Sequence, residues 1–137
     1  MYIHDFAVAA AAAVNAHDPA AVLTLWAEPA AYNSPLTGPQ AGLDALRSRE
    51  ESLFGAFSDL RATITPLGQE GLTGAMLVRF DGTHDGLYAG LPATGNTIAL
   101  EMVAIVDFDE NGVARSLQGL GLFHHLLTAD LVLLALV

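Results

Sequence analysis

Two sets of apolar residues with helical spacing occupy the first part of the chain. Phe6, Ala10, Ala13 and Val14 fall on one helical face, which predicts an amphipathic helix over residues 3–16. A second set predicts another helix over residues 42–57, and its members are Leu43, Leu46, Leu53, Phe54 and Phe57. The charged residues of that second segment, among them Arg47, Arg49, Glu50 and Glu51, are interpreted as a solvated helix face.

A short helix and then a strand with a loop are predicted between these two segments. Asp18 is a good N-cap, Pro19 suits the first helical position, and Pro29 ends the helix. Its apolar face holds Val22, Leu23 and Trp26. The next stretch, "AAYNSPLTGPQAG" (residues 30–42), is typical of a short strand followed by a loop rich in proline and glycine.

The period changes to two after residue 57. Leu60, Ala62 and Ile64 alternate with polar neighbours, and further strands are predicted at about residues 72–81, 96–108 and 113–124. "DENG" between the last two is typical of a hairpin turn, because Asn-Gly favours positive φ values. Helices followed by a meander of strands predict an α+β fold, a curved antiparallel sheet with helices on one face, in a single domain over residues 1–137. Such a fold leaves a cone-shaped cavity that suits a small apolar ligand.

Composition narrows the possible functions. The chain has 137 residues, is 53% apolar and carries a formal charge of −10; all five basic residues are arginine. That charge repels phosphate backbones and anionic lipid, so nucleic-acid and membrane-surface partners are not expected. Cysteine is absent, which excludes disulfides, thiol catalysis and cysteine-ligated metals.

The two ends of the chain are apolar without matching a targeting or membrane signal. Residues 1–14 contain His4 and Asp5 where a signal peptide has basic residues. Residues 126–137 are very apolar but number only 12, and a membrane span needs about 20. We therefore expect a cytoplasmic protein whose tail packs on the domain or on a partner subunit.

Six segments follow the first two helices in a characteristic order; they are "YNSPLTG", "GLDALR", "FSDLRATI", "GTHDGLYAGLPATG", "VDFDENGV" and "LGLFHHL". From about residue 7 to 126, this order resembles the SnoaL-like polyketide cyclases of the nuclear-transport-factor-2-like superfamily. The resemblance implies a cone-shaped fold and a cofactor-free intramolecular aldol cyclisation of a polyketide ester. It also implies an acid/base carboxylate near the end of the last strands.

The chain departs from that family pattern where the carboxylate should lie. One alignment places the acid at Gln118 and another places it near Gly121, and neither is acidic. The polar positions of the preceding strand fall at Met102 and Ala104, which are apolar. A glutamine can bind a carbonyl oxygen but cannot take a proton at neutral pH, so an altered activity is expected.

Three residues are candidates for catalysis, each with a structural alternative. His84 can serve as a pocket acid/base, or it can close the strand end and order the following loop. Glu101 lies in an apolar run and would have a raised pKa if buried, or it faces a subunit interface and pairs with Arg79 or Arg115. Gln118 is the third candidate, through its place in the family pattern.

The substrate-binding candidates are mostly aromatic. Asn33 can contact the ligand or form an Asx-turn before Pro35. The other substrate-binding candidates are Trp26, Tyr32, Phe54, Tyr88 and Met102. Trp26 and Phe54 can instead belong to the core or the pocket wall without specific contacts to the ligand. His124 and His125 do not suffice for a metal, because zinc needs three or four convergent ligands. No metal and no organic cofactor are expected.

Three functions remain open from the sequence. The first is a homo-oligomeric, cofactor-free acid/base enzyme, a cyclase or isomerase, that acts on a polyketide-derived or polycyclic molecule. The second is a non-catalytic binding module that has lost the acid. The third is an epoxide hydrolase, which usually needs two carboxylates; Glu101 and either Glu28 or Asp44 could supply them.

Overall fold

A computed structural model of the chain describes residues 1–34 and 38–122. The predicted end of the last strand, the His124–His125 pair and the apolar tail lie outside these residues. In the described part, three helices and six strands follow one another; they are α1 (Tyr2–Asn15), α2 (Pro19–Leu23), β1 (Trp26–Ser34), β2 (Gly38–Ala41), α3 (Leu43–Ala56), β3 (Arg61–Glu70), β4 (Thr73–Thr83), β5 (Thr97–Phe108) and β6 (Ala114–Leu122).

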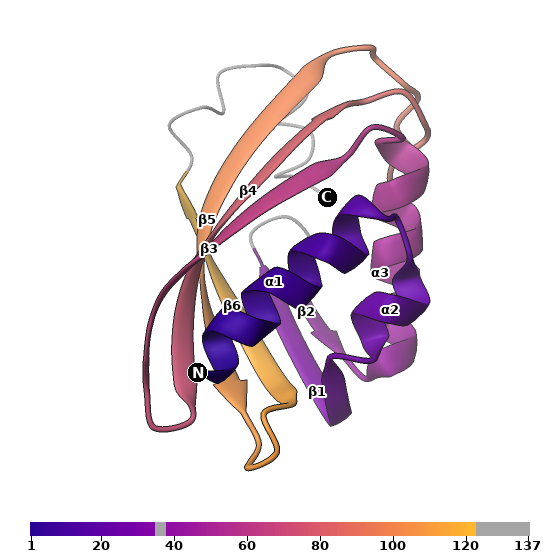
Figure 1. Cartoon of the computed structure of the whole chain (residues 1–137). Coiled ribbons are helices and arrows are strands. Elements are labelled where there is room, and N and C mark those ends of the chain that lie inside the picture. Colours follow the sequence, from indigo (N-terminus) through magenta and orange to yellow (C-terminus); the bar gives the residue numbers. More distant parts are fainter. Residues whose placement is uncertain (35–37, 123–137) are drawn as a thin grey trace.

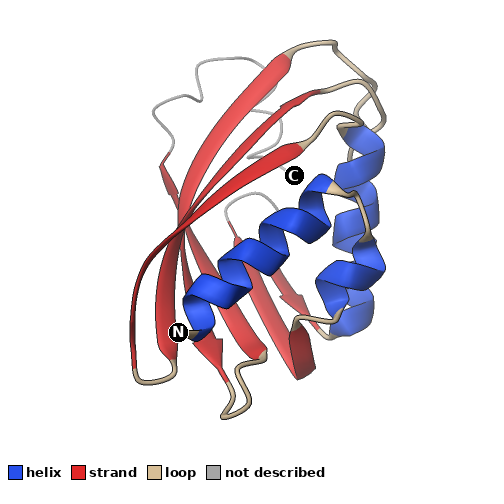
Figure 2. Ribbon diagram, in the orientation of Figure 1, coloured by secondary structure: helices blue, strands red, loops and turns tan. Residues whose placement is uncertain are grey.

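The strands form one strongly bent sheet with the helices on one side (Figures 1 and 2). The strand order is β2-β1-β6-β5-β4-β3. The predicted α+β cone is confirmed, with one correction: the sheet is mixed, because β1 and β6 run parallel while the other neighbours run antiparallel. This parallel pair joins the first strand of the chain to the last described one and bends the sheet around α1.

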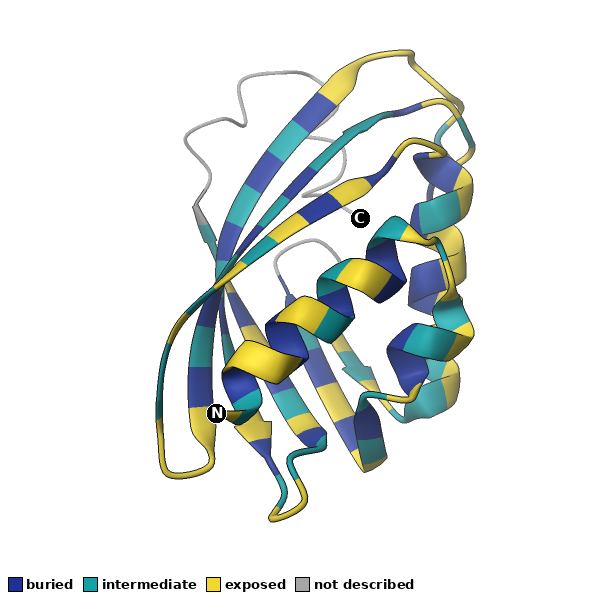
Figure 3. Cartoon of the chain, viewed as in Figure 1, coloured by how far each residue is buried: buried dark blue, intermediate teal, exposed yellow. Residues whose placement is uncertain are grey.

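Burial alternates along the strands as the two-residue period predicts (Figure 3). On β5 the even-numbered residues from Ile98 to Phe108 are buried under the helices, and the odd-numbered ones are partly or fully exposed. Phe6 of α1 packs edge-on against Trp26 and Phe108, with ring centroids 6.4 and 5.6 Å away. The concave face of the sheet and the inner faces of the helices therefore share one hydrophobic core.

The segment between α2 and α3 differs from the prediction. The Asp18 carboxylate accepts a hydrogen bond from the Ala21 N–H, as expected of an N-cap, but the helix ends at Leu23 rather than at Pro29. Trp26 begins β1, and Pro29 lies inside this strand where the pairing with β6 shifts register. A proline is tolerated there because the ladder needs no N–H from it. Residues 38–41, predicted as loop, form the edge strand β2.

The turn between β5 and β6 is confirmed. The Asp109 carboxylate accepts hydrogen bonds from the N–H groups of Asn111 and Val113, at 2.8 and 3.0 Å. Gly112 has a φ of 79°, a value that glycine adopts without strain. No helix in the described part of the chain is both long and apolar enough to cross a bilayer.

Candidate functional site

An apolar cavity of about 60 Å³ lies between the helices and the concave face of the sheet. Trp26, Tyr32 and Met102, three of the predicted ligand contacts, line it. Its other walls come from the three helices and from β3, β4 and β6; they include Phe6, Val14, Val22, Leu46, Leu53, Leu60, Val78, Phe80 and Leu117. Two charged side chains, Arg49 and Glu50, interrupt this apolar lining.

Arg49 and Glu50 form a buried ion pair with Tyr32 beside it. The side chains of Arg49 and Glu50 are 5% and 6% exposed, and an Arg49 η nitrogen donates to a Glu50 carboxylate oxygen. The other η nitrogen donates to the Tyr32 hydroxyl at 2.7 Å, and the guanidinium carbon lies 4.2 Å from the centre of the Tyr32 ring. The Arg49 Nε is buried and has no hydrogen-bond partner among the described residues.

These contacts set the protonation states of the cluster. Burial raises the pKa of the Tyr32 phenol, and the nearby Glu50 carboxylate adds to this effect, while Arg49 opposes it. Burial alone would lower the pKa of Arg49, but Tyr32 and Glu50 outweigh it and raise that pKa. At neutral pH the cluster therefore holds a neutral phenol and a guanidinium cation within one hydrogen-bonded group.

The helical period places this pair inside, although the sequence interpretation assigned both residues to a solvated face. That interpretation is wrong for Arg49 and Glu50. Leu46 and Leu53 belong to the buried stripe of α3, and positions 49 and 50 fall between them at spacings of three and four. The signal was present in the sequence: two charged residues continue the apolar stripe of a helix.

Glu101 lies on the opposite face of the sheet from the cavity. Its carboxylate accepts a hydrogen bond at 3.2 Å from Arg79, whose guanidinium also binds Asp81 at 2.9 Å. The structural alternative, pairing with Arg79, is therefore what the structure contains. The structure does not contain the other alternative, a buried acid amid apolar side chains, because the odd-numbered residues of β5 face away from the helices.

Asn33 and Gln118 meet each other, but also on the outer face. The Asn33 side-chain amide donates to the Gln118 carbonyl oxygen at 3.2 Å, across the parallel pair β1 and β6. Both line a shallow outer groove together with Ile105, Asp107 and Ser116. The structure thus brings two predicted residues together without bringing them to the cavity.

His84 is buried beside the cavity wall rather than in it. The ring is 3% exposed, lies 5.5 Å from the Phe57 ring, and approaches the Thr94 hydroxyl with Nδ1 at 3.2 Å. Its Nε2 has no hydrogen-bond partner in the described residues. The backbone of His84 pairs with Asn96 and Gly95, which closes the loop after β4, as the structural alternative expected.

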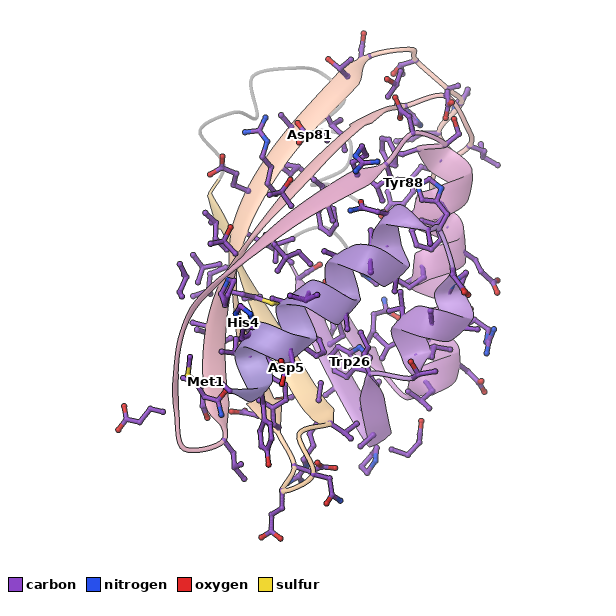
Figure 4. The ribbon with its side chains drawn as sticks, in the orientation of Figure 1. Met1, His4, Asp5, Trp26, Asp81 and Tyr88 are labelled. Carbon is purple, nitrogen blue, oxygen red and sulfur yellow. The ribbon has the colours of Figure 1, made fainter. Side chains whose placement is uncertain are left out.

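Phe54 and Tyr88 flank the site from two sides. Phe54 stacks on His17, with centroids 4.8 Å apart and planes 5° apart, and does not line the cavity. Tyr88 is buried against Phe57 and lines both a smaller apolar cavity and an outer groove beside α3. Figure 4 shows Tyr88 close to α3 and Trp26 nearer to α1 and α2.

Two aspartates stabilise the position of the loop between β4 and β5, residues 84–96, which contains Tyr88 and is called the Tyr88 loop below. The Asp85 carboxylate accepts hydrogen bonds from the Ser58 N–H and hydroxyl, which lowers the pKa of Asp85. Asp59 receives matching bonds from Thr83, which lowers its pKa too. A side chain at Gly86 would place Cβ 2.0 Å from the Gly55 carbonyl oxygen, so only glycine fits this contact between loop and helix.

The carboxylates proposed for an epoxide-hydrolase pair lie elsewhere. Glu28 accepts a hydrogen bond from the Leu43 N–H at the start of α3, and Asp44 is exposed. Glu50 is the one carboxylate that lines the interior cavity in the described residues. The same residues contain no group of three histidine, aspartate or glutamate side chains that could hold a metal ion.

Fold and cavity together define a cone-shaped α+β protein with a helix-covered interior pocket. The sequence profile of the SnoaL-like polyketide cyclase family matches residues 4–117, and the chain belongs to that family. A comparison with curated protein sequences found no match.

Solved structures share this fold at low sequence identity. AclR, a candidate hydroxylase from Streptomyces galilaeus, is 20% identical, with a TM-score of 0.76 over 98% of this chain and 82% of its own. A candidate SnoaL-like polyketide cyclase from Jannaschia sp. CCS1 is 14% identical, with a TM-score of 0.77 over 93% and 90%. The epoxide hydrolase/cyclase-like enzyme SalBIII of salinomycin pyran-ring formation is 17% identical, with a TM-score of 0.74 over 90% and 92%. At these identities the likeness establishes the fold.

Proposed function

We propose that the chain is a cofactor-free acid/base enzyme, an aldol-type cyclase or isomerase, whose reaction takes place at Arg49, Glu50 and Tyr32. The observation that carries this proposal is the buried ion pair in an otherwise apolar cavity. Burying two charges is costly, and apolar residues of similar size often give equal or greater stability at such positions. A charged pair retained there, next to a phenol, supports a chemical role.

The three side chains have complementary roles in proton abstraction next to a carbonyl group. The Glu50 carboxylate takes the proton from the carbon beside the carbonyl. The Tyr32 phenol, held neutral by its raised pKa, donates to the carbonyl oxygen, and the Arg49 cation stabilises the enolate that forms. The nucleophilic enolate carbon can then bond to a second carbonyl carbon within the same molecule, and the alkoxide that forms takes back the proton held by Glu50; alternatively, that proton returns to a different carbon and gives an isomer.

Cavity size limits the substrate. A cavity of about 60 Å³ is much smaller than the sites of drug-sized ligands, which span roughly 300–1,000 Å³. A second apolar cavity beside it shares the walls Leu53, Leu60 and Phe80. A polyketide-derived substrate with more than one ring would have to displace these shared side chains.

Deuterium uptake tests the proposal without knowledge of the natural substrate. The protein is incubated in D₂O with cyclopentanone or with the two-ring ketone β-tetralone, and exchange at the carbon beside the carbonyl is followed by NMR. We expect Glu50→Gln to lose the protein-dependent exchange and Glu51→Gln, the same change at an exposed neighbour, to retain it. Glu50→Asp keeps the charge and serves where Glu50→Gln is too unstable. Exchange that is equal in wild type and both Glu50 variants would refute the assignment.

Non-catalytic ligand binding is the second candidate. It is favoured by the close pairing of Glu50 with Arg49, which occupies the carboxylate before any substrate arrives. Under this alternative Trp26 fluorescence responds to ligands while no exchange is catalysed. The epoxide-hydrolase function receives less support, because the second carboxylate is missing from the described cavity lining.

Self-association and a cytoplasmic location remain part of the proposal. Apolar side chains on the outer sheet face, Leu77, Val103, Ile105 and the 54% exposed Leu120, support a homo-oligomer built on that face. Sedimentation of the wild type and of Leu120→Glu would test it.

A further inference from the structure

A polar groove of about 270 Å³ lies on the side of α3 that faces β2 and the Tyr88 loop. Ser48 and Ser52 line it from successive turns of the helix, Gln40 lines it from β2, and Tyr88 with Ala89 closes the far side. The two serines are exposed, so their hydroxyls are accessible to a ligand. The groove therefore offers several hydrogen-bond donors along one wall.

Arg49 lines this groove as well as the interior cavity. It sits at the edge of the buried stripe of α3, with Ser48 and Ser52 on its outer side and Glu50 on its inner side. A guanidinium carries five N–H donors, of which one bonds Glu50, one bonds Tyr32, and the buried Nε has no partner among the described residues. One cation thus belongs to the lining of both the interior cavity and the groove.

Tyr88, on the far side of this groove, is held in place by a tight turn. Tyr88 and Leu91 exchange two backbone hydrogen bonds of 3.0 and 2.8 Å, and the residues between them, Ala89 and Gly90, both have positive φ, at 48° and 85°. This is the geometry of a two-residue hairpin turn. Burial raises the pKa of the Tyr88 phenol, and the Arg49 charge opposes part of this effect.

We infer that the groove binds the carboxylate of an amphipathic carboxylic acid whose apolar part enters the interior cavity. The carboxylate would accept hydrogen bonds from Arg49 and from the hydroxyls of Ser48 and Ser52. This assignment names the substrate class of the proposed enzyme and rests on that proposed function. It gives Arg49 two roles, recognition of the carboxylate and stabilisation of the enolate.

Charge balance favours a monoanion over a phosphate dianion. The chain carries a formal charge of −10, so an approaching anion is repelled unless a local cation compensates. The described lining of the groove contributes one cation, which Glu50 already neutralises in part. A single carboxylate needs one guanidinium and a few hydroxyl donors, and the groove provides that set.

The test compares an acid with its uncharged amide. Trp26 is the one tryptophan of the chain and lines the cavity, so its fluorescence reports entry of the apolar part. Isovalerate and isovaleramide have the same small branched body and differ in charge. We expect the acid to bind roughly tenfold more tightly, which corresponds to about 1.4 kcal/mol.

Two variants with the same change of charge localise the carboxylate. Ser48→Asp replaces a proposed hydroxyl donor by a negative charge inside the groove, so isovalerate should no longer bind more tightly than isovaleramide. Arg47→Gln also changes the charge by −1, on the same helix but at an exposed residue outside the groove, and should keep the preference.

Equal affinities for acid and amide would overturn the inference, and so would a preference that survives Ser48→Asp or the absence of binding by both probes. The deuterium-exchange assay separates this result from failure of the enzyme proposal. Glu50-dependent exchange without a carboxylate preference refutes the groove alone. A groove-dependent preference with exchange that does not depend on Glu50 refutes the acid/base assignment alone.

Discussion

An arginine–carboxylate pair lies on each side of the sheet, one on helix α3 and one on strands β4 and β5, and the two pairs differ mainly in burial. On the concave side Arg49 and Glu50 are about 5% exposed and lie among apolar side chains. On the outer side Arg79 and Glu101 have side chains that are 43% and 25% exposed, and Asp81 shares the arginine. The same pair of residue types is therefore placed once in a buried apolar cavity and once at a partly exposed surface.

Burial changes what each pair can contribute. In the cavity, each charge depends on its partner, because removal of one leaves the other uncompensated in an apolar setting. On the outer face, water and salt replace a lost partner at little cost. The inner pair is thus a sensitive part of the molecule and a candidate for chemistry, whereas the outer pair belongs to the surface.

The largest effect is expected from breaking the inner pair. Glu50→Gln should lower the free energy of unfolding by about 3–5 kcal/mol, since Arg49 would stay buried without a counter-charge. Urea denaturation followed by Trp26 fluorescence measures this loss. Glu51→Gln on the exposed side of the same helix is the control and should leave stability nearly unchanged. If Glu50→Gln lowered the free energy of unfolding as little as Glu51→Gln does, Glu50 would be solvated rather than buried.

Replacing the whole inner pair should have the opposite sign. Arg49→Met combined with Glu50→Leu removes both charges while filling similar volume, so the unfolding free energy should stay equal or rise by about 1–4 kcal/mol. The double variant should also lose deuterium exchange and the preference for isovalerate. A double variant that is stable but inactive would show that the ion pair serves the reaction and is not needed for folding. A strongly destabilised double variant would show instead that the pair stabilises the fold.

The sequence predicted most of the fold because the periods of its strands and helices are clean. β3 to β6 alternate and α1 and α3 carry apolar stripes, and the bounds of α1, α3, β4 and β5 lie close to the predicted ones. The errors fall on prolines. Proline ends helices and disfavours central strands, but it is allowed at a register shift, as at Pro29, and on an edge strand, as at Pro39. Only the pairing of the strands in three dimensions reveals that these two residues occupy such positions.

The site was harder to predict for two physical reasons. β5 is apolar on both faces, so alternation grouped Glu101 with Val103 and Ile105 correctly but could not say which group faces the helices. On α3, Arg49 and Glu50 were predicted to face solvent because they are charged, although their spacing from Leu46 and Leu53 indicated that they face the core. Spacing was the better guide, because a helix buries a stripe whatever residues occupy it.

A smaller effect is expected from the phenol of the inner cluster. Tyr32→Phe removes the acceptor of the 2.7 Å bond from Arg49 and should cost about 1 kcal/mol at neutral pH. The raised pKa of Tyr32 means that its contribution is complete below the ordinary value of 10.0 and is lost as pH rises past it. Wild type should therefore lose stability in alkali more steeply than Tyr32→Phe. Identical alkaline profiles would show that Tyr32 is not buried as the structure has it.

The smallest effect is expected from Glu101→Gln in the outer pair, and finding no effect there would support the contrast between the two pairs. Glu101→Gln leaves Arg79 bonded to Asp81 through two hydrogen bonds of 2.9 Å, so no charge becomes isolated. Stability should change within the error of urea denaturation, and added salt should reduce even that difference. Deuterium exchange should be unaffected, because the carboxylate lies across the sheet from the cavity. Loss of exchange in this variant would place a reaction on the outer face and reverse the contrast between the two pairs.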